Sequence, residues 1–394
     1  MKVLLCPMSQ AGYLYPALAI GRELAAGGDE VTLLGPPSTA CHAAAAGLTY
    51  IAAEKHNGTY GFSVGRWYLD SAAQVSNIAR TARELHSDVV VASALSLGAM
   101  LAGELLDLPV IVIGFATHIL NYRTSGREGP DQVALRRWRS ESVLNFYRTA
   151  REQQGLVPRR DALPEAPLYG AGLLLRGSAA LQCPDAELPA QVHQVGPCFW
   201  EPSTPAEELS QVTEMLRRNG KRVVYVHLGR TFADGTIGGA SLWPVLNRLF
   251  TGSDFQAVVE TGRSGLPRAS PKADITVVHK PWMRRLVALS ELVMTGGTTS
   301  PVSAALWAAR PLLMAPAGSE QPVLTDACVR AGVAHEFVRV SDGRAAELIP
   351  AAIDALSKRA VTVSAELRAM PGPRRATRLI RSAVGAVQPH TSTG

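Results

Sequence analysis

Cysteine is scarce in this chain of 394 residues, and its five cysteines are spread from position 6 to position 328. None forms a C-x-x-C pair, so the sequence favours neither a disulfide framework nor a zinc cage, and we expect reduced thiols. A run of about twenty apolar residues, the length that a membrane-spanning helix needs, is also missing. The opening residues MKVLLCPMSQ are interrupted by Pro7 and lack the apolar core of a secretion signal. We therefore expect a cytoplasmic protein without a transmembrane segment.

Aromatic residues make up only 6% of the chain, although its formal net charge is +6. A positive charge indicates a nucleic-acid partner when basic side chains gather on one surface beside aromatic rings on which bases can stack. The basic clusters here are short, as at 136–139 and 373–381, and none is interleaved with such a set of rings. We expect no nucleic-acid partner.

Several motifs that bind nucleotides or metals are absent. No G-x-G-x-x-G follows the first predicted strand of either half, and no G-x-x-x-x-G-K-[ST] occurs. The sequence therefore favours neither a protein that binds nicotinamide dinucleotides nor one with P-loop chemistry. H-E-x-x-H and D-x-D, which are signs of a zinc protease and of a metal-bridged diphosphate, are missing too. A nucleotide bound here would have to be held by helix N-termini and loop amides. We therefore expect no metal and no resident cofactor.

The length corresponds to two or three domains at roughly 150 residues each. Short runs rich in Val, Ile and Leu alternate with helical patterns, which is typical of strands buried on both faces of a parallel sheet. These runs lie at 2–6, 30–34, 88–92, 109–114, 222–228, 255–260, 274–278, 292–294 and 311–315. We predict an α/β protein with two Rossmann-like, doubly wound domains. The expected boundaries are 1–200 and 218–373 for the domains, 201–217 for a proline-containing linker, and 374–394 for a closing helix and tail.

The segment 294–321 carries the densest set of ligand-binding groups. A predicted strand runs into two glycines, which let the backbone approach a ligand closely, and three hydroxyl residues precede a helix opened by Pro301. The glycines and hydroxyl residues are Gly296, Gly297, Thr298, Thr299 and Ser300. Amides, hydroxyls and the positive end of a helix dipole converge there, which suits a diphosphate held without a metal. An ordinary strand-to-helix turn with a hydroxyl cap is the alternative.

The predicted strand at 311–315 leads into a loop that contains Glu320 and Gln321. An adjacent carboxylate and amide can hydrogen-bond neighbouring hydroxyls of a sugar. The two halves of this segment together place groups suited to a diphosphate near groups suited to sugar hydroxyls.

These motifs resemble those of the nucleotide-sugar-dependent glycosyltransferases of the GT-B architecture, in particular the family-one type that acts on natural products. That family ends its second domain with a His-Gly-Gly-x-Gly-Thr loop and an Asp/Glu-Gln pair, and Thr295 stands here at the position of the histidine. GYLYP at 12–16 is similar to the family's Gly-His-x-x-Pro motif, and VGPCF at 195–199 to the lead-in to its linker. The resemblance implies that an acceptor-binding domain and a donor-binding domain face each other across a cleft.

The resemblance also implies further donor-binding residues. RVVYVHLGRT at 222–231 is similar to a strand and turn that touch the diphosphate, and HKPWMRRLVAL at 279–289 to a loop that frames the nucleobase. The candidates are Gly229, Arg230 and Thr231 for the diphosphate and Lys280, Pro281 and Trp282 for the nucleobase. The Arg230 guanidinium would suit phosphate oxygens. For Trp282, a place in the hydrophobic core is the alternative.

The sequence departs from the family where the reaction needs a base. The acceptor hydroxyl must lose its proton, a task that the family gives to the histidine of Gly-His-x-x-Pro, oriented by an aspartate. Tyr13 and Ser93 stand at these two positions, and a phenol with an ordinary pKa of about 10 is a poor base at neutral pH. Three explanations stay open: an acceptor that needs little activation, another base such as His118 or His227, or a degenerate homologue that binds without transferring.

The resemblance implies an inverting, metal-independent glycosyltransferase of natural-product or antibiotic biosynthesis. Its partners would be a dTDP- or UDP-linked sugar and a small secondary metabolite, and assembly into a homodimer is left open. The aromatic, Gly-containing segment 56–70 is our candidate for an acceptor loop, with a variable surface loop as the alternative. The binding-only homologue would act as a partner subunit. A sugar-nucleotide epimerase is less favoured, because Glu320 is the only evident carboxylate for acid/base chemistry around the hexose.

Overall fold

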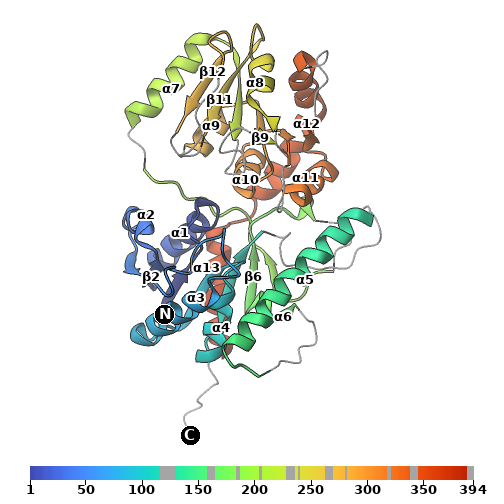
Figure 1. Ribbon diagram of the computed structural model, residues 1–394. Coiled ribbons are helices and arrows are strands. Elements are labelled where there is room, and N and C mark those ends of the chain that lie inside the picture. Colours follow the sequence, from blue (N-terminus) through green and yellow to red (C-terminus); the bar gives the residue numbers. More distant parts are fainter. Residues whose placement is uncertain are drawn as a thin grey trace. The chain divides into compact units, whose positions relative to one another are not determined.

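The computed structural model divides the chain into two compact units (Figure 1). Unit 1 consists of Met1–Gly177, Cys183–Pro202 and Met370–Gly394, and unit 2 of Ser178–Gln182 and Ser203–Ala369. The structure describes residues 1–115, 130–157, 165–182, 187–203, 206–227, 236–237, 240–261, 269–279, 282–316, 321–337 and 345–387.

Unit 1 is built on a sheet of seven parallel strands in the order β3-β2-β1-β4-β5-β6-β7. The strands are β1 (Lys2–Cys6), β2 (Glu30–Gly35), β3 (Thr49–Ala52), β4 (Val89–Ser93), β5 (Val110–Gly114), β6 (Gly172–Leu175) and β7 (Val192–Gln194). Side chains alternate between the two faces, so that Leu4 and Cys6 enter one apolar cluster and Val3 and Leu5 the other. Because both faces of its central strands are buried, those strands are apolar apart from Lys2 at the start of β1 and Ser93 at the end of β4.

Helices cover both faces of this sheet. Residues of α3, α4 and α5 enter the cluster on one face, and residues of α1, α2 and α13 enter the cluster on the other. The helices are α1 (Ala11–Ala26), α2 (Ala40–Ala45), α3 (Ser71–Leu85), α4 (Leu97–Leu106), α5 (Pro130–Gln153), α6 (Ala166–Tyr169) and α13 (Pro373–Val387), with a 3-10 turn at Pro37–Thr39.

Unit 2 contains a second parallel sheet, of six strands in the order β12-β11-β8-β13-β14-β15. Its strands are β8 (Arg222–His227), β11 (Phe255–Glu260), β12 (Ile275–Val278), β13 (Leu292–Thr295), β14 (Leu312–Met314) and β15 (Ala334–Glu336), and β9 (Thr236–Ile237) forms a separate antiparallel pair with β10 (Ala240–Ser241). Its helices are α7 (Ala206–Asn219), α8 (Trp243–Leu249), α9 (Met283–Leu289), α10 (Thr299–Trp307), α11 (Gln321–Arg330) and α12 (Ala345–Arg368), with a 3-10 turn at Ala179–Leu181.

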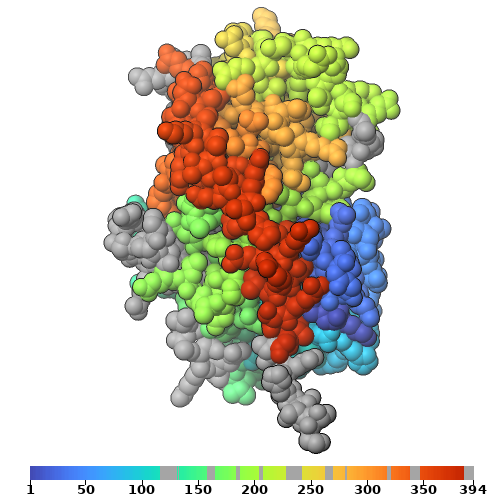
Figure 2. Space-filling model, turned by 180° about the vertical axis from the view of Figure 1, so that it is seen from behind, coloured from blue at the N-terminus to red at the C-terminus, as the bar shows by residue number. Residues whose placement is uncertain are grey.

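The last helix belongs to unit 1, where α13 packs beside α1 (Figure 2). Ile380 of α13 is fully buried in the same apolar cluster as the inner face of α1. Around this contact, the Arg381 guanidinium donates to the Asp29 carboxylate at 2.8 Å, and Arg374 lies 3.3 Å from Glu23. The expected closing helix is therefore part of the first unit, because its apolar stripe completes the covering of that sheet.

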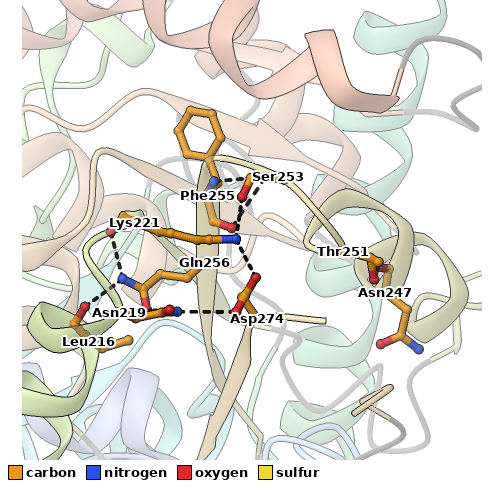
Figure 3. Close-up of polar contacts among 9 residues, drawn as sticks. All are labelled: Leu216, Asn219, Lys221, Asn247, Thr251, Ser253, Phe255, Gln256 and Asp274. Carbon is orange, nitrogen blue, oxygen red and sulfur yellow. Dashed lines mark hydrogen bonds and ion pairs between the residues drawn. The ribbon is translucent and has the colours of Figure 1, made fainter. Parts of the chain in front are cut away.

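A hydrogen-bonded network ties the amino ends of the unit 2 strands to α7 (Figure 3). The buried Gln256 amide donates to the carbonyl oxygens of Leu216 at 2.8 Å and of Lys221 at 2.7 Å, and accepts from Asn219 at 3.1 Å. The Lys221 ammonium in turn pairs with Asp274 at 2.7 Å. This network lies at the amino ends of the strands, on the opposite side of the sheet from their carboxyl ends. It therefore stabilises the unit without taking part in a site at the carboxyl ends.

The sequence predicted this fold class correctly, and all nine predicted strands are present with ends within one residue of the observed ones. Two local features differ. The expected linker 201–217 overlaps most of α7, because a helical pattern begins directly after the last proline of that stretch. The sequence also gives no sign that Pro16 lies inside a helix, as it does in α1, which begins at Ala11.

In the ranges that the structure describes, no helix is both long and apolar enough to cross a membrane. The cysteines within those ranges are unpaired. The same part of the chain holds no group of three His, Cys, Asp or Glu side chains arranged to bind a metal ion.

Candidate active site

In both units, predicted site residues lie where parallel strands end. Tyr13 lies in the first turn of α1, which follows β1, and Ser93 is the last residue of β4. His227 and Thr295 end the neighbouring strands β8 and β13 and stand opposite each other in register. Loops at the carboxyl ends of strands form the ligand sites of doubly wound sheets. We call the side of each sheet where the carboxyl ends of its strands lie the unit 1 edge and the unit 2 edge.

At the unit 2 edge, the turn from β13 to α10 is built around Gly297. Its φ is +88°, and a Cβ there would lie 3.0 Å from Thr325 Oγ1 and 3.2 Å from the Gln321 carbonyl oxygen. Glycine alone fits such a position without strain. The Thr295 hydroxyl accepts a hydrogen bond from the Gly297 amide at 3.3 Å, so the residue at the position of the family's histidine shapes the turn from inside.

The N-terminus of α10 has no side-chain cap. Thr298 is the N-cap residue, but its side chain accepts no backbone hydrogen bond, and Thr299 and Ser300 beside it are partly exposed. Thr325 Oγ1 is buried without a hydrogen-bond partner. Uncapped amides, hydroxyls and the positive end of the helix dipole at one place suit an anionic ligand. The structure thus brings the predicted residues 296–300 together with Thr325, which the sequence did not single out because a threonine inside a helix carries no local signal.

His227 brings an unpartnered nitrogen to the same edge. Its Nδ1 atom is buried and has no hydrogen-bond partner, and burial lowers the pKa of the imidazole to about 4. The ring is therefore neutral at pH 7, where it can donate or accept a hydrogen bond. A nitrogen that binds a proton this weakly is a poor general base.

Two of the remaining candidates for the donor site, Trp282 and Gln321, are buried in unit 2. Trp282 is the N-cap residue of α9 and is only 4% exposed, which agrees with a place in the core; contact with a nucleobase stays a prediction. Gln321 begins α11 and is buried. Seven candidates lie outside the described residues: His118, Gly229, Arg230, Thr231, Lys280, Pro281 and Glu320.

At the unit 1 edge, Ser93 bonds to the backbone. Its hydroxyl is buried and accepts a hydrogen bond from the Met8 amide at 3.0 Å, which holds the loop after β1 against the end of β4. Tyr13 lies partly buried against one apolar cluster of the unit. The bond to Met8 gives Ser93 a structural role, and catalytic roles for Ser93 and Tyr13 stay predictions.

The predicted acceptor loop lies against the loop that follows β1. The Val64 amide donates to Gln10 Oε1 at 3.0 Å, directly before α1. Farther along, the ring of Tyr68 stacks on Phe146 of α5 with 4.6 Å between centroids, and Tyr68 remains 39% exposed. The segment therefore contributes aromatic surface near the unit 1 edge, as an acceptor loop would, and its role stays a prediction.

Sequence reasoning missed Arg176, the residue that follows β6. It is only 6% exposed, and its Nη2 donates to the Gly12 carbonyl oxygen at 3.3 Å. In an α-helix that carbonyl would accept from the amide four residues later, but the residue there is Pro16, which has no N–H. The spacing of Gly12 and Pro16 signals an unpaired carbonyl, and the fold alone shows that Arg176 supplies its donor.

Solved glycosyltransferases match nearly the whole chain in structure. The glycotransferase of kitacinnamycin is 20% identical, covers 97% of this chain and 98% of its own, and has a TM-score of 0.73. The glycosyltransferase SnogD from Streptomyces nogalater is 20% identical over 97% and 99% of the two chains, with a TM-score of 0.66. The spinosyn rhamnosyltransferase SpnG, complexed with thymidine diphosphate, is 20% identical over 97% and 100%, with a TM-score of 0.65.

The chain has the GT-B glycosyltransferase fold. No protein-family profile and no curated protein matches the sequence, and at 20% identity these likenesses establish the fold alone. Within the GT-B fold, unit 1 is the amino-terminal domain and unit 2 the carboxyl-terminal domain. The turn between β13 and α10 lies at the edge to which the resemblance assigns the nucleotide sugar.

Proposed function

We propose that this protein is a glycosyltransferase that moves a sugar from a nucleotide diphosphate to a small natural-product acceptor. The observation that carries the proposal is the turn from β13 to α10. There a glycine without room for a side chain leads into an uncapped helix N-terminus, beside hydroxyls and the unpartnered Thr325 oxygen. The GT-B fold, shared with solved enzymes of natural-product chemistry, supports the same reading.

For the donor, we propose a dTDP- or UDP-linked sugar. SpnG, which shares the fold, is described in complex with thymidine diphosphate. In our proposal the amides at the start of α10 bind phosphate oxygens, and the partial positive charge of the helix, roughly half an elementary charge, offsets the charge of the diphosphate. Thr298, Thr299 and Ser300 would add hydroxyl donors, so that no metal ion is needed.

For the reaction, we propose inversion at the anomeric carbon. The acceptor hydroxyl releases its proton to solvent as its oxygen attacks from the face opposite the diphosphate, the bond from carbon to diphosphate breaks, and its electron pair leaves with the phosphate. Negative charge grows on the leaving group, where the start of α10 stabilises it. With a pKa of about 4, His227 serves better as a neutral hydrogen-bonding group beside the diphosphate than as the base.

A homologue that binds the nucleotide sugar without transferring it is the second candidate. It is favoured by the residues at the positions of the family's dyad: Ser93 is engaged with the Met8 amide, and Tyr13 replaces the histidine. The turn around Gly297 does not separate the two candidates, because both need it to hold the diphosphate.

One experiment separates these candidates. The full chain is screened by thermal shift against dTDP- and UDP-linked sugars, and the sugars that bind are incubated with phenolic, amine and polyketide acceptors before mass spectrometry. We expect stabilisation by a sugar nucleotide and a product heavier by one sugar, also in the presence of EDTA. Binding without product from any acceptor would favour the binding-only homologue. Stabilisation by no sugar nucleotide would refute both candidates, and loss of product in EDTA would refute metal independence.

A further inference from the structure

Arg176 is a buried cation at the unit 1 edge, and the function proposed above does not use it. It follows β6, and its own amide donates to the Gly114 carbonyl oxygen of β5 at 3.2 Å, so the backbone is fixed there by the sheet. The side chain reaches toward α1, where it bonds to the Gly12 carbonyl oxygen. Gly12 and Tyr13 are only partly buried, so this guanidinium lies beside residues that solvent reaches.

The bond to Gly12 leaves most N–H donors of the guanidinium unused. Arginine has five N–H donors, and for Arg176 the structure gives one hydrogen bond from the side chain. Its Nε atom is buried without a partner. An unpartnered buried donor costs free energy unless something else bonds to the group or stabilises its charge.

The charge of Arg176 is also unbalanced. Among the described residues no Asp or Glu side chain pairs with it; the neighbours that interact with its charge are Cys198 and Tyr13. Burial raises the pKa of the Cys198 thiol to about 12, so that thiol is neutral at pH 7. Burial lowers the pKa of Arg176 itself, but an arginine side chain keeps its proton in proteins. A buried charge without a counterion is strongly unfavourable, so an anion from outside the described residues would be bound there.

Arg151 shows what a satisfied buried arginine in the same unit looks like. Its Nη2 and Nε donate to the Glu104 carboxylate at 2.5 and 3.1 Å, in the paired geometry that arginine prefers. Arg176 has the same degree of burial but a carbonyl in place of the carboxylate. The difference indicates that Arg176 is placed to bind an anionic ligand reversibly.

We propose that Arg176 binds the ionised oxygen of the acceptor, and that the acceptor is an oxygen acid such as an acidic phenol. This inference rests on the proposed function. The acceptor O–H gives its proton to solvent, the oxyanion beside Arg176 attacks the anomeric carbon and forms the new C–O bond, and the old bond breaks with its electron pair on the diphosphate. A guanidinium that favours the ionised acceptor removes the need for a strong base, which accounts for a tyrosine and a serine at the positions of the family's dyad.

The test uses 4-nitrophenol, whose absorption distinguishes its phenol and phenolate forms, with the full-length protein. The variants are Arg176→Gln, which keeps an amide donor for the Gly12 carbonyl but removes the charge, and Arg176→Lys, which keeps the charge. Arg137→Gln is the matched control, because it removes an equal charge from the surface of the same unit. Below the ordinary pKa of the dye, we expect wild type and Arg137→Gln to bind it as phenolate. We expect Arg176→Gln to bind it at least tenfold more weakly and without the phenolate absorption, and Arg176→Lys to lie nearer wild type.

Two results would overturn the inference. One is that Arg176→Gln binds 4-nitrophenol with the affinity and the dye absorption of wild type. If that variant does not fold, an equal affinity of wild type for 4-nitrophenol and for benzyl alcohol would overturn the inference in the same way. The other is displacement of the dye from wild type by inorganic pyrophosphate, which would assign the cation to a phosphate anion. The binding assay needs no sugar donor. Failure to transfer any sugar would therefore refute the proposed function, whereas failure of the dye assay refutes only the role of Arg176.

Discussion

Replacing Gly297 with alanine tests the turn on which the proposed donor site depends. At φ +88° an alanine is strained by roughly 1–2 kcal/mol. The new methyl would also approach the Gln321 carbonyl oxygen to 3.2 Å and Thr325 Oγ1 to 3.0 Å. The first of these is backbone and cannot rotate away, so overpacking adds about 1–3 kcal/mol. We therefore expect Gly297→Ala to lower the free energy of unfolding by about 2–5 kcal/mol.

Gly252→Ala is the matched control, because Gly252 is an exposed glycine of the same unit with φ +66° and no atom within 4 Å of its added Cβ. It should lose only the conformational part, roughly 1–2 kcal/mol. Urea unfolding gives both losses, and calorimetric titration of dTDP and UDP gives the affinities. We expect Gly297→Ala to bind the better nucleotide at least about tenfold more weakly, equivalent to about 1.4 kcal/mol, and Gly252→Ala to bind it normally. Equal stability losses together with equal nucleotide affinities in the two variants would refute this account of the turn.

Three further predictions concern other parts of the two units. Gln256→Leu leaves two backbone carbonyls unpaired, so it should lower the free energy of unfolding in urea by about 2–4 kcal/mol while nucleotide affinity stays unchanged; a loss of affinity would contradict its structural role. Ser93→Ala leaves the buried Met8 amide unpaired and should cost about 1–3 kcal/mol, with kcat preserved well below the melting temperature; a collapse of kcat in a folded variant would make Ser93 catalytic. Because the unfolded chain takes up a proton on His227 near pH 6.5 and the folded chain only near pH 4, stability should fall on acidification through this window. Between pH 7 and pH 5 this residue should account for about 2 kcal/mol of the loss in the free energy of unfolding. Urea unfolding of His227→Gln at both pH values checks this, because the stability of that variant should vary less with pH.

The strands were predictable because the central strands of both sheets are buried on two faces, which leaves a continuous apolar run in the sequence. β1 and β11 coincide with their runs residue for residue. In the two large sheets, the strands that the sequence did not reveal are β3, β6, β7 and β15, all of three or four residues and three of them partly exposed. A strand that is short and half solvated has too little apolar pattern to stand out from a loop.

The sequence by itself determined which residues meet in the turn around Gly297, because glycines, hydroxyls and a helix start are adjacent along the chain. It also revealed the departure from the family's dyad at Tyr13 and Ser93. The tertiary structure alone decided that Ser93 bonds to a backbone amide and that Arg176, more than 160 residues from Gly12, supplies the donor that Pro16 lacks. Local pattern encodes what one segment can do, whereas the partner of a buried polar group is set by which strands become neighbours in the sheet.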